Sequence, residues 1–257
     1  KKSVDTGSGS KEPDSGKSYI PPDYKPPEKK VSNSSDDTSC LGCIGYILLI
    51  IVAVLAIRYA FKKFNGTVDW SKYDSQTCVE LDLRESNIKS IKGIEEFTNL
   101  EKLILDKNKI KDISSLKELK NLKYLSINDN QLTDISSIGR LTNLEHLSLK
   151  KNQVRDIDSL AGLEKLSDLN LESNQVSDIR SIEKLTNLEY LYLGENQIVD
   201  IGGLGALTNL RMLSLENNHI KDISSIGRLT NLRSLSLYIN QISDVSGLRG
   251  LKSIENI

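Results

Sequence analysis

The chain has 257 residues, of which 34 are lysine or arginine and 35 are aspartate or glutamate, giving a formal net charge of −1 at pH 7. This balance argues against a nucleic-acid-binding protein, because such a protein carries an excess of basic side chains along one surface. The three cysteines and two histidines are not spaced as the four ligands of a structural zinc site, so we predict neither a metal nor another cofactor.

Residues 1–40 contain all five prolines of the chain, set among serine, glycine and charged residues. Bulky apolar residues are scarce, so the segment cannot bury enough surface to offset the entropy lost on ordering. We predict a disordered segment. The stretch IPPDYKPPEKK is compatible with a polyproline conformation that a proline-reading domain binds, and an extended linker is the simpler alternative.

Residues 41–61, LGCIGYILLIIVAVLAIRYAF, carry no charge before Arg58. At about 1.5 Å per residue this segment forms a helix of roughly 31 Å, which matches the hydrocarbon core of a bilayer. Residues 58–64 are basic and aromatic and suit the membrane interface. We predict a single transmembrane helix in contact with lipid, and not a cleaved signal peptide, because a long polar segment precedes it.

Residues 62–77 are predicted to form a juxtamembrane linker and a short N-terminal cap. Lysine and arginine are slightly more concentrated just after the predicted helix than before it. This distribution favours a cytoplasmic location for everything that follows. Sequences that fit the N-glycosylation pattern lie on both sides of the helix, so they do not decide the orientation.

From residue 78 to 257 the sequence repeats with a period of 22 residues. The skeleton is L-x-x-L-x-L-x-x-N-x-I-x-D-I-x-x-L-x-x-L, and one of its positions is occupied by Leu81, Leu103, Leu125, Leu147, Leu169, Leu191, Leu213, Leu235 and Ile257. A fixed period of this length predicts a solenoid. The L-x-L alternation predicts one short strand per repeat, with leucines inward, and therefore a parallel sheet.

Two polar columns accompany the leucines. An asparagine recurs after each strand, at Asn108, Asn130, Asn152, Asn174, Asn196, Asn218 and Asn240. We interpret it as a buried structural ladder, because each side-chain amide can bond the backbone of adjacent coils. An aspartate recurs four residues later, at Asp112, Asp134, Asp156, Asp178, Asp200, Asp222 and Asp244, where it fits the N-cap of a short helical turn.

This skeleton resembles the leucine-rich repeat family, and its LTNL and DISSI variants are most similar to bacterial internalins and the related phosphatase-regulator class. The resemblance covers residues 78–257 as eight repeats, and it implies that the sequence stops at Ile257 just as a ninth strand begins. It departs at Ser86, at Phe97 and at the pair Glu164-Lys165, without breaking the apolar register. It implies an α/β solenoid with a curved parallel sheet on the concave face and short 3-10 or helical turns on the convex face.

The resemblance also implies a non-catalytic surface that binds a protein partner through the concave face, and an extracytoplasmic repeat domain. No G-x-S-x-G, phosphate-binding loop or metal-spaced cluster occurs in the sequence, so no catalytic residue is predicted. Two alternatives remain open. One is a cytoplasm-facing scaffold that docks on an enzyme such as a phosphatase, and the other is the sensor part of a larger protein with a catalytic domain downstream.

The strand positions that point away from the leucines form the predicted binding surface. Earlier repeats place charges there that we expect to be solvated: Glu80, Arg84, Lys102, Asp106, Lys107, Lys150, Lys151 and Asp168. Later repeats place apolar and aromatic side chains there, predicted to be exposed partner-binding anchors with a rim of Glu172, Glu195 and Glu216. These anchors are Tyr190, Tyr192, Met212, Tyr238 and Ile239, and a second candidate pair is Tyr124 and His146.

Overall fold

The computed structural model describes residues 66–256. The predicted disordered segment 1–40 and the predicted transmembrane helix 41–61 lie outside this range. Within it, no helix combines the length and the apolar character needed to cross a membrane.

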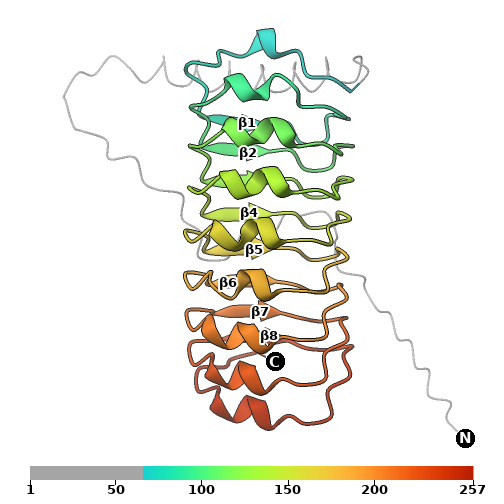
Figure 1. Ribbon diagram of the computed structural model, residues 1–257, viewed down its shortest axis with the longest axis vertical. Helices are drawn as coiled ribbons and strands as arrows, with labels where there is room; N and C mark the ends of the chain where they lie inside the picture. Colours follow the sequence, from blue (N-terminus) through green and yellow to red (C-terminus); the bar gives the residue numbers. More distant parts are fainter. Residues whose placement is uncertain (1–65, 257) are drawn as a thin grey trace, which may run out of the picture. The chain divides into compact units, whose positions relative to one another are not determined.

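The described residues form a solenoid in which every coil contributes one strand, and the strands pair in sequence order as one parallel sheet of eight (Figure 1). Each inward leucine pairs with the leucine of the next coil, as Leu81 does with Leu103. The predicted parallel sheet is thus confirmed. The strands are β1 Glu80–Asp82, β2 Lys102–Ile104, β3 Tyr124–Ser126, β4 His146–Ser148, β5 Asp168–Asn170, β6 Tyr190–Tyr192, β7 Met212–Ser214 and β8 Ser234–Ser236.

Short 3-10 turns form the side of the coils opposite the sheet (Figure 1). Because the strand and the turn of one coil are joined within 22 residues, neither has room for a longer element. The turns are η1 Trp70–Lys72, η2 Ile94–Glu96, η3 Ser114–Glu118, η4 Ser136–Arg140, η5 Asp158–Gly162, η6 Arg180–Ile182, η7 Gly202–Ala206, η8 Ser224–Arg228 and η9 Ser246–Gly250.

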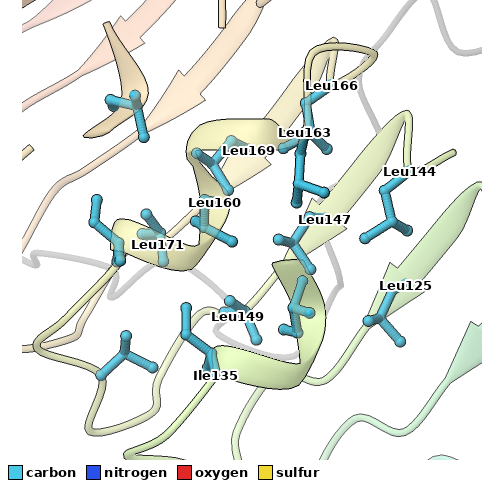
Figure 2. Packing of buried hydrophobic residues seen from close by; sticks show 14 of the residues in the cluster. Leu125, Ile135, Leu144, Leu147, Leu149, Leu160, Leu163, Leu166, Leu169 and Leu171 are labelled. Atoms are coloured by element: carbon cyan, nitrogen blue, oxygen red, sulfur yellow. The ribbon is translucent and has the colours of Figure 1, made fainter. Parts of the chain in front are cut away.

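The core lies between the sheet and the turns and runs through successive coils. Leu169 and Leu171 from the β5 region and Leu160 from η5 are fully buried. Figure 2 shows these side chains pointing toward one another, next to Leu147 and Leu149 of the preceding coil. Since the same positions are apolar in each repeat, stacking the coils buries one continuous core.

The recurring asparagines connect neighbouring coils. Asn174 Oδ1 accepts a hydrogen bond from Val154 N at 3.0 Å, and its Nδ2 donates to Leu149 O at 2.9 Å and to Leu171 O at 3.0 Å. The other asparagines of the column make the corresponding bonds. Each side chain therefore provides hydrogen bonds to backbone groups of two coils. These groups need such partners because water does not reach them in the interior.

Each recurring aspartate lies one residue before the N-cap position of its 3-10 turn, instead of at the N-cap as predicted. Asp112 Oδ1 accepts a hydrogen bond from Ser114 N at 2.8 Å, but Ser114 is the first residue of η3, and Ile113 occupies the cap position. The expectation of an N-cap aspartate was wrong by one position, although the carboxylate still binds a free amide at the start of the turn. This bond from the backbone of Ser114 is the main cause that lowers the pKa of Asp112.

An aromatic cluster covers the first coil. The Trp70 and Phe97 rings lie 5.2 Å apart, and Trp70 Nε1 donates a hydrogen bond to Lys92 O at 2.6 Å. Gly93 adopts φ 103°, and a Cβ there would overlap the Trp70 ring, so glycine is required at this position. Phe97 thus fills a leucine position and also binds the cap, which explains its departure from the skeleton.

Candidate partner-binding surface

The outward strand positions and the second and third residues after each strand form one surface, which we call the sheet face. Tyr190 and Tyr192 lie on β6, and Met212 on β7 is the register partner of Tyr190. The Tyr192 hydroxyl donates to Met212 Sδ at 2.9 Å. All three side chains are half-buried, not fully exposed as predicted, because strands about 4.8 Å apart let large side chains cover one another.

Tyr238 and Ile239 are the most accessible apolar side chains of the sheet face, at 64% and 67% exposure. They follow β8 instead of lying on it. Ile239 adopts φ 52°, in the left-handed region. That conformation disfavours β-branched residues, and the equivalent position in other coils holds Lys107, Ser173 or Asn217, among others.

Tyr124 and His146, the second predicted pair, are neighbours on β3 and β4. Their rings lie 5.8 Å apart, and Lys102 Nζ lies 5.7 Å from the centre of the Tyr124 ring. His146 Nδ1 lies 2.9 Å from Asp168 Oδ2. The structure therefore extends this pair into a row of side chains across β2 to β5.

Asp106 and Asp168 are not solvated, contrary to the expectation for charged residues of the sheet face. Asp106 is 6% exposed, and its Oδ1 accepts hydrogen bonds from Ser126 Oγ at 2.6 Å and Asn128 N at 2.8 Å. Asp168 Oδ1 is buried and has no hydrogen-bond donor among residues 66–256. Burial raises the pKa of Asp106. The burial of these two aspartates was not predicted, because it depends on residues of the neighbouring coils.

Replacing Asp106 with asparagine is expected to raise the melting temperature at pH 7. Asn128 already makes the equivalent bonds in the next coil, to Ser148 Oγ and Lys150 N, so an amide fits. Since the folded pKa of Asp106 is raised, ionisation costs stability as the pH rises through the unfolded and then the folded pKa.

The gain should therefore shrink as the pH is lowered toward 3, where the parent carboxyl becomes protonated. Thermal melts across this pH range measure it, with Asp129→Asn on the exposed turn as the control. An equal gain at both pH values would contradict the assignment of the effect to a buried charge.

The two halves of the sheet face differ in charge. Toward the N-terminus, acidic and basic side chains form pairs, such as Lys107 with Glu85 at 2.9 Å and Arg84 with Asp82 at 3.0 Å. From β5 to β8, the sheet-face positions contain no lysine or arginine. Their carboxylates are those of Asp168, Glu172, Glu195 and Glu216.

Comparison with known families decides the assignment. A model described as leucine-rich repeats (2 copies) matches residues 76–118, 120–162, 164–206 and 208–250, more than half of the chain. The chain belongs to the leucine-rich repeat family. No curated protein sequence matches it.

Solved leucine-rich repeat structures share the fold. An internalin, InlF from Listeria monocytogenes, is 39% identical with a TM-score of 0.66 over 67% of this chain and 52% of its own, so this chain spans about half of that protein's length. Internalin C2 from the same organism is 35% identical, with a TM-score of 0.71 over 79% of this chain and 90% of its own.

A plant relative is the leucine-rich repeat ectodomain of the membrane receptor kinase GASSHO1/SCHENGEN3 from Arabidopsis thaliana. That structure is in complex with CASPARIAN STRIP INTEGRITY FACTOR 2. It is 26% identical, with a TM-score of 0.59 over 66% of this chain and 22% of its own. Leucine-rich repeat proteins of this kind mediate protein–protein interactions, and the internalin-like relatives are interaction scaffolds.

Proposed function

We propose that this protein is a membrane-anchored leucine-rich repeat protein that binds a protein partner through the sheet face, the face that the family resemblance implies to be concave. The observation that carries the proposal is the adjacent exposure of Tyr238 and Ile239. Exposed aromatic and aliphatic side chains on a rigid support are typical anchors of protein interfaces.

Ile239 strengthens this argument. A β-branched residue in the left-handed region is strained, and an isoleucine that is 67% exposed gains little from the core. Strain without a folding benefit points to a role in binding. Tyr190, Tyr192 and Met212 extend the surface inward from this exposed end as a half-buried apolar row.

The relatives support the same function. The plant receptor ectodomain was solved in complex with CASPARIAN STRIP INTEGRITY FACTOR 2, and the internalin structures share the repeat fold. We extend to this chain only the general mode, recognition of a protein by a preformed repeat surface. Shape complementarity on a rigid scaffold limits the entropy cost of binding.

Photocross-linking from a benzophenone side chain at position 238 should recover the partner, and affinity measurements then test the surface. Tyr238→Ala is expected to weaken binding by about 1 to 3 kcal/mol with little change in melting temperature, because Tyr238 is largely exposed. Tyr192→Ala should weaken binding similarly but also lower the melting temperature, since Tyr192 is half-buried.

The matched controls are Lys107→Ala and Lys151→Ala, on the charged half of the sheet face. Neither should reduce affinity as much as the tyrosine changes. A larger loss from the lysine changes would place the partner on the N-terminal half and refute the assigned surface.

We further propose that residues 41–61 anchor the protein in a bilayer and that the repeats lie outside the cytoplasm. The protein should stay in the membrane fraction under carbonate or high salt, because apolar burial is not screened by ions. Release by either treatment would contradict the anchor. In sealed, right-side-out vesicles, added protease should digest the repeats, whereas protection would place them in the cytoplasm.

A further inference from the structure

We propose that the partner inserts a cationic side chain, an arginine or a lysine of a polypeptide, between Glu195, Glu216 and the ring of Tyr238. This inference rests on the proposed function and adds the chemistry of the bound segment. It follows from three features of the sheet face between β6 and β8: uncompensated carboxylates, the space provided by a glycine, and an accessible aromatic ring.

The carboxylates of Glu195 and Glu216 lack cationic partners among residues 66–256. Glu195 Oε2 accepts a hydrogen bond from Ser173 Oγ at 2.5 Å, and Glu216 Oε2 accepts one from Ser214 Oγ at 2.6 Å. By contrast, Glu172 is neutralised by Lys150 at 2.8 Å. The serines orient the two carboxylates but leave both negative charges uncompensated.

Gly194 leaves room for the side chain of Glu216 from the next coil. A Cβ at this position would overlap the Glu216 carboxylate, so that carboxylate lies over Gly194 in the space that a side chain would otherwise fill. The backbones of the two glutamates are also adjacent, with Glu195 N donating to Glu216 O at 2.8 Å. Two uncompensated carboxylates on adjacent coils make this part of the sheet face negatively charged, and such a surface attracts a cation of the partner.

Tyr238 completes the site. Partial desolvation, and after it the negative charges of Glu216, Glu195 and Glu172, raise the pKa of its hydroxyl. Tyr238 lies on the next coil, where its backbone O accepts a hydrogen bond from the amide of Asn217, the residue after Glu216, at 2.9 Å. The residue is 64% exposed, so its ring can contact a bound cation through its face. A guanidinium fits well because it pairs with carboxylates in two directions and stacks on aromatic rings.

A polypeptide cation fits the site better than a metal ion. Within residues 66–256, no three histidine, cysteine, aspartate or glutamate side chains are grouped to hold a metal. The apolar neighbours Ile239 and Tyr192 favour the aliphatic stem of arginine or lysine, which packs on apolar surface while its charge meets the carboxylates.

The test uses the full chain in mild detergent and a phage-displayed library of random dodecapeptides. Selected peptides are expected to be enriched in arginine or lysine. For the strongest synthetic peptide, arginine-to-citrulline or lysine-to-norleucine replacement should reduce affinity by about tenfold or more, and added salt should also weaken binding. The double variant Glu195→Gln/Glu216→Gln should show a similar loss.

The control Glu164→Gln/Glu183→Gln makes the same charge change at exposed positions near the 3-10 turns and should leave affinity unchanged. Two outcomes would overturn this inference and leave the proposed function standing. In the first, peptides bind the parent more tightly than Tyr238→Ala but need no arginine or lysine. In the second, peptides bind the Glu195→Gln/Glu216→Gln variant as well as the parent. Peptides that tolerate Tyr238→Ala and Tyr192→Ala, or failure to select any peptide, would count against both.

Discussion

Leu169→Ala is expected to lower the free energy of unfolding by about 2 to 5 kcal/mol, the range for a large side chain removed from a packed interior. Leu169 is fully buried on β5 between its register partners Leu147 and Leu191. Because repeats are stabilised by contacts with their neighbours, a cavity in a central coil weakens both of its interfaces. Denaturant unfolding followed by circular dichroism measures the loss.

Val199→Ala is the control, since Val199 is 56% exposed and should change stability by no more than about 0.5 kcal/mol. If both changes had the same small effect, Leu169 could not lie in a packed core. Such a result would contradict the stacking of coils.

Asn174→Ala should destabilise the protein by about 1 to 3 kcal/mol, because it leaves buried backbone groups without partners. Val154 N loses its acceptor, and Leu149 O and Leu171 O lose a donor. Asn152→Ala should behave alike, since it makes the same bonds one coil earlier.

Asn187→Ala provides the comparison, at the start of the next repeat. Asn187 Nδ2 also donates to a backbone oxygen of the preceding coil, Glu164 O at 2.8 Å, but at an exposed site where water can replace it. Asn187→Ala should therefore lower the free energy of unfolding much less than Asn174→Ala does. Equal losses for Asn174 and Asn187 would show that burial does not control the strength of the ladder.

The period of the sequence predicted the strands, their parallel order and the solenoid, because each inward leucine position is set by its own repeat. The Asn column could also be interpreted, since a polar residue at a fixed place in an apolar pattern needs backbone partners. The aspartate column was displaced by one residue, because the 3-10 turn begins after Ile113.

The sheet face was harder to predict, because exposure there depends on the neighbouring coils. Tyr192 is covered in part by Met212. Asp168 contacts His146 of the preceding coil, and its Oδ1 is buried. Aligning the repeats by register would have placed Asp168 between His146 and Tyr190. The cap formed by Trp70 has no counterpart within the repeat and gave no periodic signal.

Hydroxyl-radical footprinting of the protein with and without its bound partner tests the central claim most directly, because it reports the accessibility of individual side chains. If the sheet face is the binding surface, partner binding should reduce oxidation of Tyr238, Ile239 and Met212. His219, which is exposed but lies off the sheet face, should be oxidised as before. Protection of His219 or of side chains near the 3-10 turns, with Tyr238 unchanged, would contradict binding through the sheet face.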